Sequence, residues 1–168
     1  ILAVHHALLD RHEYAAPGRL RDQQVWIGRN ALSPHTASFV PPHHTRVPEA
    51  LNDLFGFVHR ADLPVLTQVA IAHAQFETIH PFNDGNGRVG RTLVHAMLRR
   101  SGVTHALTIP VSAGLLTDTS GYFRALSDYR EGYLAPIIHQ FVGASFRAIG
   151  NGRALVDDLE RIYGEWGE

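Results

Sequence analysis

Twelve residues near the middle of the chain, from His80 to Arg91, bring together an imidazole, a carboxylate, a Gly-Asn-Gly turn and two guanidinium groups. The helical apolar pattern that resumes after them predicts that a helix begins near Asn86. The first turn of a helix has N–H groups without intrahelical partners and lies at the positive end of the helix dipole. The backbone of Gly85, Asn86 and Gly87 is therefore expected to form a cradle that binds an anion, and phosphate is the expected ligand.

Side chains around this cradle add charge and a proton acceptor. Arg88 and Arg91 are three residues apart on one helix face, so both guanidinium groups can bind phosphate oxygens, and two arginines indicate a polyphosphate. Asp84 lies just before the cradle, where its carboxylate would hold Mg²⁺ together with phosphate and water. His80, at the end of the preceding helix, is the expected general base. Phe82 is expected to anchor the loop in the core.

Each of these features also has an ordinary structural explanation. A histidine at a helix end is more often a cap or a surface residue than a base, and a Gly-Asn-Gly sequence is usually a turn. The base, the carboxylate, the cradle and the two arginines would need five separate structural explanations within twelve residues. Their spacing therefore favours a functional site.

Apolar residues at helical spacing predict helices on both sides of this site. The helix after it is expected to end at Arg99, Arg100 and Gly102, because cations and a glycine are typical of helix C-termini. In a later long helix, the Gly-Asn-Gly sequence at Gly150–Gly152 predicts a bend or a break. The expected helices are the first residues up to about His12, 47–60, 63–79, 86–100, a short helix capped by Asp118 or Thr119, and a long helix with Pro136 in its first turn.

Strand signals are confined to one region. Val25–Ile27 and Ser38–Val40 are β-prone and flank a connection rich in Gly, Asn, Ser and Pro, which predicts a hairpin with a long loop. Pro41 and Pro42 end the second strand because proline has no ladder donor, and the hairpin edge is expected to stay open. The predicted fold class is therefore mainly α, a helical bundle with one β-hairpin flap.

Composition limits the class of protein. The chain has 168 residues, 45% of them hydrophobic and 18% charged, which fits a single compact domain over residues 1–168. A net charge of −1 and a pI of about 6.9 argue against nucleic acid as a partner. No apolar run is long enough to span a membrane and no cysteine is present, so a soluble, cytoplasmic protein is expected. The start at Ile1, already in a helical pattern, indicates truncation at the N-terminus.

The sequence HPFNDGNGR followed by Arg91 resembles the full signature of the Fic (Fido) family, His-x-Phe-x-Asp/Glu-Gly-Asn-Gly-Arg-x-x-Arg. The segments QVWIG, FVPP, AHAQFETIHPF and YFRAL are also similar to family segments and follow in the same order. The resemblance extends from about Arg21 to Phe141. It implies an all-α core with a β-hairpin flap above the motif, in agreement with the patterning.

The resemblance implies Mg²⁺-dependent transfer of AMP from ATP to a Ser, Thr or Tyr hydroxyl of a target protein, with release of pyrophosphate. In this interpretation His80 deprotonates the hydroxyl, and Asp84 holds the Mg²⁺ that bridges the α- and β-phosphates. The nucleotide would be bound by Gly85, Asn86 and Gly87 at the transferred phosphoryl group, Arg88 at the β-phosphate, Arg91 at the γ-phosphate, and Tyr122 and Phe123 at the adenine.

Two further expectations concern protein partners. A target is expected to add an extended segment to the free edge of the flap, along Val40 and Pro41, and so to present its hydroxyl to the base. Many family members carry an inhibitory helix with the pattern Ser/Thr-x-x-x-Glu-Gly/Asn, which SDYREG at Ser127–Gly132 matches. This stretch coincides with an ordinary turn of the family. A segment upstream of Ile1 or on a separate protein is therefore a better candidate for the inhibitor than Glu131.

Other functions stay open at this stage. His73, Glu77 and His80 are spaced to bind a transition metal from one helix face, which would indicate a metallohydrolase, but this alternative gives the two arginines no role. Within the resemblance, Doc-like kinases transfer the γ-phosphate, and Gly87 argues against them because they have a bulkier residue there. Transfer of UMP or phosphocholine, hydrolytic removal of AMP, and an inactive scaffold are further alternatives.

Overall fold

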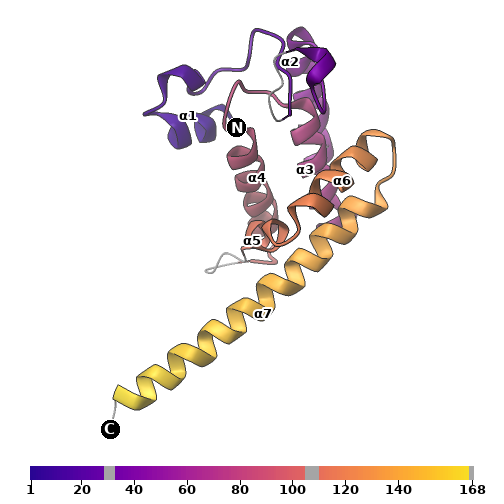
Figure 1. The fold of residues 1–168 in the computed structure, drawn as a ribbon. Coiled ribbons are helices and arrows are strands. Elements are labelled where there is room, and N and C mark those ends of the chain that lie inside the picture. Colours follow the sequence, from indigo (N-terminus) through magenta and orange to yellow (C-terminus); the bar gives the residue numbers. More distant parts are fainter. Residues whose placement is uncertain (29–32, 105–109, 167–168) are drawn as a thin grey trace. The chain divides into compact units, whose positions relative to one another are not determined.

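The computed structural model describes residues 1–28, 33–104 and 110–166, and helices dominate these residues (Figure 1). The chain divides into two compact units, Ile1–Leu98 and Arg99–Glu168. In the described residues the α-helices are α1 (Leu2–Leu9), α2 (Val47–Val58), α3 (Val65–Ile79), α4 (Asn86–Arg100), α5 (Val111–Leu116), α6 (Thr119–Arg130) and α7 (Ala135–Trp166), and the 3₁₀ turns are η1 (Glu13–Ala15), η2 (Pro34–Thr36) and η3 (His44–Arg46). The predicted mainly α class is confirmed.

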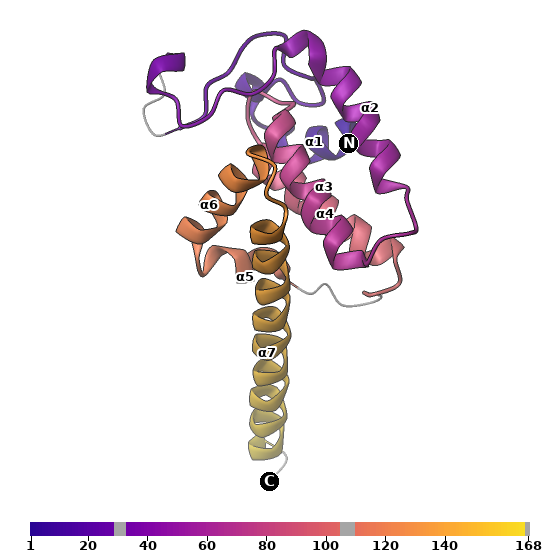
Figure 2. The ribbon, with the colours of Figure 1, turned by 90° about the vertical axis from the view of Figure 1, so that its right-hand side faces the viewer.

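The helix α3 forms much of the core of the first unit, and α2 runs beside it (Figure 2). Side chains of α3 are buried on most of its faces, which is the pattern of a helix enclosed by other elements. In contrast, α2 buries one stripe formed by Val47, Leu51 and Leu54, as its helical spacing predicts. The packing of α3 therefore fixes the position of its C-terminal end, where the predicted site begins.

A glycine in α4, Gly90, lets the side chains of His73 and Glu77 of α3 pack closely against the backbone of α4. A Cβ built on Gly90 would lie 3.3 Å from His73 Cε1 and 2.6 Å from Glu77 Oε1, so a larger residue would displace these side chains. His73 is 2% exposed, and burial lowers its pKa to about 4. The imidazole is therefore neutral at physiological pH and belongs to the core.

The predicted β-hairpin is wrong for the described residues. Val25–Ile27 and Ser38–Val40 form no strands there, and one isolated antiparallel bridge joins Ile27 to Phe39. Ile27 N–H donates to Phe39 O at 2.9 Å, and Ile27 O accepts from the amides of Ser38 and Phe39 at 2.8 and 3.1 Å. The flap consists of two antiparallel arms, a first arm of residues 21–27 and a second arm of residues 38–42. The residues between 28 and 33 lie outside the described part.

Two prolines explain why backbone pairing does not continue beyond this bridge. Pro41 and Pro42 have no N–H group, so the second arm cannot extend a ladder of backbone hydrogen bonds. Side chains of the first arm supply donors instead, because Gln24 Nε2 donates to Pro41 O at 2.9 Å and Arg21 Nη2 donates to Pro42 O. Bonds from side chains to backbone therefore replace the predicted sheet.

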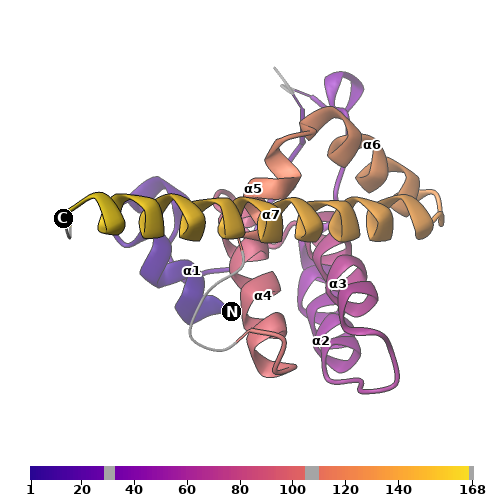
Figure 3. The ribbon, with the colours of Figure 1, turned by 90° about the horizontal axis from the view of Figure 1, so that it is seen from below.

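In the second unit, α5 and α6 pack against the N-terminal part of α7 (Figure 3). Gly114 of α5 lies directly against the backbone of Ala144, where a side chain would collide. Arg147 of α7 donates to Gly114 O at 3.0 Å and so ties the two helices together. Asp118 caps α6, as predicted, by accepting from the amide of Gly121 at 2.8 Å.

The predicted boundaries around the site are confirmed, whereas the predicted interruption of the long helix is wrong. The site helix α4 begins at Asn86 and ends at Arg100, and Gly102 follows in a left-handed conformation with φ 75°. α7 continues through Gly150–Gly152, because a helical glycine costs about 1 kcal/mol, which good helix formers on both sides can offset. Among the described helices, none has both the length and the apolar character of a membrane span.

The buried, neutral His73 predicts that stability depends on pH. Because folding lowers its pKa from 6.5 to about 4, its contribution is complete above about pH 6.5 and is lost as the pH falls toward about 4. Between about pH 7.5 and about pH 5, we expect this group to reduce the free energy of unfolding by roughly 2 kcal/mol. Urea unfolding of the wild type and of His73→Gln at both pH values measures the effect. An equal pH dependence of the two proteins would contradict a neutral His73.

Candidate active site

His80 directly follows α3 and turns the chain away from the helix. Its backbone is left-handed, with φ 48° and ψ 63°, a conformation that costs energy in a residue with a side chain. The His80 amide donates to Phe76 O at 3.0 Å and so completes the last turn of the helix. The predicted base therefore lies at a backbone corner that the surrounding structure must hold in place.

The carboxamide of Asn86 closes the loop that follows this corner. Its Oδ1 accepts from Phe82 N–H at 2.9 Å, and its Nδ2 donates to Phe82 O at 2.8 Å. Asn86 is buried, and Phe82 is fully buried, as predicted for a loop anchor. Asn86 thus has a structural function that its spacing did not indicate. Its predicted contact with a phosphoryl group stays a prediction.

A second buried histidine, His5 of α1, holds the same loop. Its ring stacks on Phe82 with the ring centroids 3.8 Å apart. Gly18 N–H donates to His5 Nδ1 at 2.9 Å, so Nε2 carries the proton and donates to Asp84 O at 3.1 Å. Burial lowers the pKa of His5 and so favours this neutral form. Sequence reasoning missed His5, because a contact across 79 residues leaves no local signal.

The start of α4 has amides without a helical acceptor, as the predicted anion cradle requires, and anion binding there stays a prediction. The first helical hydrogen bond runs from Val89 N–H to Gly85 O at 3.0 Å. The amides of Asn86, Gly87 and Arg88 precede this bond, so they have no acceptor within the helix. They also lie at the positive end of the helix dipole. This geometry suits a phosphate group.

The two glycines of the cradle have different functions. Gly85 has a φ of 79° and lies against α1, where a side chain would collide with Leu9, so glycine is needed for both conformation and space. At Gly87, apart from its chain neighbours and the backbone of its own helix, a Cβ would meet one atom of the described residues within 4 Å, Arg91 Nη1 at 3.3 Å. The space over Gly87 is therefore open to a ligand and bordered by a guanidinium group.

Asp84 and Arg88 form an ion pair beside the cradle. Arg88 Nη2 lies 2.9 Å from Asp84 Oδ2, and the two side chains are 39% and 43% exposed. Because an exposed pair of this kind contributes about 0–1 kcal/mol, either member can exchange its partner for a ligand at small cost. The carboxylate is then available to a metal cation, and the guanidinium group to a phosphate.

Arg21 is a residue of the site that sequence reasoning also missed. Its side chain is buried, and burial lowers the pKa of its guanidinium group, which nevertheless stays charged. The group lies at the C-terminal end of α3, where the helix dipole favours a cation. It donates to His80 O at 2.8 Å, Gln23 O at 3.0 Å, Ile79 O at 3.4 Å and Pro42 O.

The two residues predicted to dock a target differ in exposure. Val40 is 43% exposed, whereas Pro41 is buried and its carbonyl accepts from Gln24. Val40 is therefore the accessible member of the pair. The docking of a target segment stays a prediction.

Tyr122 and Phe123, which were expected at the adenine, belong to α6 in the second unit. Their ring centroids lie 5.4 Å apart, and Phe123 is 63% exposed. Their contact with a nucleotide stays a prediction. The possible inhibitory sequence Ser127–Gly132 forms the C-terminal end of the same helix, with Glu131 at the cap position and Gly132 at φ 95°.

The alternative of a transition-metal site has no support in residues 1–28, 33–104 and 110–166. No group of three His, Asp or Glu side chains there could hold a metal ion. His73 and Glu77 pack around Gly90 in the core, whereas His80 belongs to the turn after α3. The three residues of the proposed ligand set therefore serve different parts of the structure.

The residues from His80 to Arg91 can thus bind a polyphosphate and accept a proton. Open amides and two arginines offer positive potential, an exposed carboxylate offers an oxygen ligand, and an imidazole lies at the preceding corner. Such a set suits transfer of a phosphoryl or nucleotidyl group to a deprotonated nucleophile.

Comparisons with known proteins agree with this chemistry. Protein adenylyltransferase fic-1 of Caenorhabditis elegans is 29% identical over 153 residues, which are 86% of this chain and 28% of that protein. Protein adenylyltransferase Fic of Nematostella vectensis is 28% identical over 152 residues, or 89% of this chain and 32% of that protein. The chain thus spans about a third or less of the length of these curated relatives.

The fold is also found in a solved structure. The crystal structure of a Fic family protein from Desulfovibrio desulfuricans G20 is similar with a TM-score of 0.78 and 29% sequence identity, over 92% of this chain and 46% of that chain. The model of the Fic/DOC family matches residues 1–98, which include the motif loop, the two arms and most of α4. With that match over more than half of its 168 residues, the chain belongs to the Fic/DOC family.

Proposed function

We propose that this chain transfers AMP from ATP to a Ser, Thr or Tyr hydroxyl of a target protein. The observation that carries the proposal is the start of α4, where three amides have no acceptor within the helix and the Arg91 guanidinium group borders the space over Gly87. The relatives named protein adenylyltransferase support AMP as the transferred group. The open space over Gly87 favours this orientation of ATP over the one in which the γ-phosphate is transferred.

In the proposed reaction, His80 removes the proton of the target hydroxyl, and the hydroxyl oxygen attacks the α-phosphorus of ATP. The bond between the α-phosphorus and the oxygen that bridges it to the β-phosphorus breaks, and pyrophosphate leaves. The amides of α4 and Arg88 would stabilise negative charge on the phosphates, and Arg91 would hold the γ-phosphate. A rigid corner at His80 would keep the base in reach of the hydroxyl.

Mg²⁺ suits the donor set of this site. The Asp84 carboxylate is a hard oxygen ligand, is 43% exposed, and has an ion-pair partner that it can exchange. Asp84 would therefore hold the cation. When bound, Mg²⁺ would neutralise charge on the phosphates and polarise their oxygens.

The remaining roles are part of the same proposal. A target segment would dock beside the exposed Val40, and the adenine would contact Tyr122 and the exposed Phe123. Because Ser127–Gly132 serves as an ordinary helix end, an inhibitory glutamate would come from a segment upstream of Ile1 or from a separate protein. The two units would together act as one catalytic domain, in line with the 92% of the chain that the solved structure covers.

Labelled ATP tests which group is transferred. The chain is incubated with Mg²⁺ and an array of extended peptides, each with one Ser, Thr or Tyr, and with ATP labelled on either the α- or the γ-phosphate. We expect peptide labelling from the α-phosphate alone, because the bond between the α- and β-phosphates breaks. Labelling from the γ-phosphate alone would show a kinase and contradict AMP transfer.

The role of His80 as the base predicts a loss of transfer without a loss of nucleotide binding. His80→Ala is expected to lower the rate of AMP transfer by a factor of about 10² or more, and to leave the Kd for ATP and Mg²⁺ nearly unchanged. Transfer assays and calorimetric titration measure the two quantities. His59→Ala, at an exposed histidine that caps α2, serves as the control. Full activity of His80→Ala would exclude a catalytic base at this position.

The role of Arg91 predicts a selective loss of triphosphate affinity. Arg91→Ala removes one charge-assisted contact, so the Kd for ATP is expected to rise about tenfold, whereas the Kd for AMP is expected to change little. Arg99→Ala, at an exposed arginine on the same helix, is the matched control. Equal weakening of ATP and AMP binding would argue against a contact with the γ-phosphate.

A further inference from the structure

We propose that Arg21 is a positioning residue of this site, which holds the backbone of His80 and couples it to the arm on which a target would dock. The proposal rests on the proposed function, because it concerns the base and the docking arm of AMP transfer. Arg21 lies 59 residues before His80 and outside the motif, so its role comes entirely from the folded structure.

The guanidinium group of Arg21 joins three separate segments of the chain. Its Nε donates to His80 O at 2.8 Å, its Nη1 donates to Gln23 O at 3.0 Å, and its Nη2 donates to Pro42 O. The amide of Arg21 also donates to Pro81 O at 2.9 Å. Because a guanidinium group is planar and rigid, the second arm cannot move relative to His80 without breaking one of these bonds.

The bond to the His80 carbonyl has a direct effect on the base. The carbonyl direction is set by the backbone torsions of His80, which are left-handed and therefore need support from the surroundings. The same torsions set the direction in which the imidazole leaves the main chain. Arg21 is 3% exposed, so no water can easily replace it as a donor. Loss of this support is expected to displace the imidazole rather than the nucleotide.

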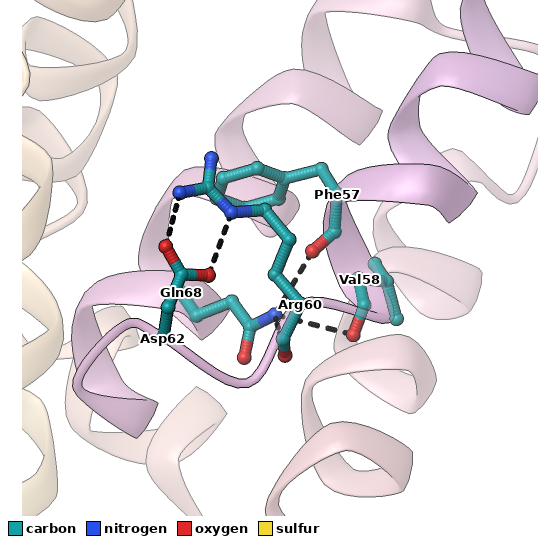
Figure 4. Close-up of polar contacts among 5 residues, drawn as sticks. All are labelled: Phe57, Val58, Arg60, Asp62 and Gln68. Atoms are coloured by element: carbon teal, nitrogen blue, oxygen red, sulfur yellow. Dashed lines mark hydrogen bonds and ion pairs between the residues drawn. The ribbon is translucent and has the colours of Figure 1, made fainter.

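A comparable side chain holds the other end of α3 and offers a matched control (Figure 4). Gln68 Nε2 donates to three carbonyl oxygens at the end of α2 and in the segment after it: Phe57 at 2.9 Å, Val58 at 3.2 Å and Arg60 at 2.9 Å. Like Arg21, Gln68 is buried. It lies twelve residues before His80, or about 18 Å along a helix. Removing it disturbs the same helix without touching the site.

The test compares Arg21→Met with Gln68→Met, since both changes keep much of the side-chain volume and remove the donors. With α-labelled ATP and an acceptor peptide from the array, we expect Arg21→Met to lower kcat by about tenfold or more. The Kd for ATP and Mg²⁺ should stay within about twofold of the wild-type value. Amide hydrogen exchange should speed up across Phe76–Phe82. Gln68→Met should keep kcat and exchange in that segment, although both variants lose thermal stability.

Equal losses of kcat in the two variants would reduce Arg21 to a general stabilising residue and overturn the proposal. A loss of ATP affinity as large as the loss of kcat in Arg21→Met would do the same. If Arg21→Met does not fold, Arg21→Lys is measured instead, and wild-type kcat in that variant would overturn the proposal, because one ammonium group cannot hold three segments. If the wild type transfers no AMP, the proposed function fails, and the exchange data still show whether Arg21 holds the His80 corner.

Discussion

The carbonyl groups at the C-terminal end of α3 need hydrogen-bond donors, and one buried guanidinium group supplies them. Arg21 bonds to Ile79 O and His80 O just where the chain turns into a left-handed conformation. Without a donor, these carbonyls would be desolvated and unpaired, which costs about 1–3 kcal/mol for each group. The negative end of the helix dipole also favours a cation at this place. The backbone corner at His80 thus depends on a charged group that is itself buried.

The loop after this corner is held by hydrogen bonds between its backbone and two side chains, one later in the chain and one earlier. Asn86 reaches back to both polar groups of Phe82, and His5 reaches from α1 to Asp84 O. These contacts pair both backbone polar groups of Phe82 and the carbonyl group of Asp84. The amides of Asn86, Gly87 and Arg88 at the start of α4 have no acceptor within the helix, and in the proposed function they would meet the anion already arranged. Such preorganisation is what stabilises developing charge without a cost of rearrangement.

Burial separates the groups that build this site from those that can react with a ligand. His73 is buried and neutral at physiological pH, and burial also favours the neutral form of His5, so neither brings a charge into the core. Asp84 and Arg88 are partly exposed and charged, and they pair with each other beside the cradle. A pair that contributes little to stability can be broken by a metal ion and a phosphate. The two charged groups to which the proposed function assigns ligands are therefore groups that water reaches.

The sequence by itself determined what depends on local spacing. The start of α4 at Asn86, the cap at Asp118 and the register of the motif from His80 to Arg91 follow from neighbours a few residues apart. Spacing also suggested a hairpin, but Pro41 and Pro42 offer no N–H group to a ladder, and their carbonyl groups accept from the side chains of Gln24 and Arg21 instead. Likewise, Gly150–Gly152 did not interrupt α7, since a preference of about 1 kcal/mol per glycine is outweighed by the rest of the helix.

Only the tertiary structure decided which groups hold the site together. Arg21 meets His80 across 59 residues, and His5 meets Asp84 across 79 residues. In the sequence, one is an ordinary arginine and the other is one histidine among twelve. Periodicity and motif spacing describe the order of side chains along a helix or a loop, whereas these contacts depend on where separate segments meet. The physical reason is that a buried carbonyl can accept from any donor that the fold brings near, so the partner leaves no mark in the local sequence.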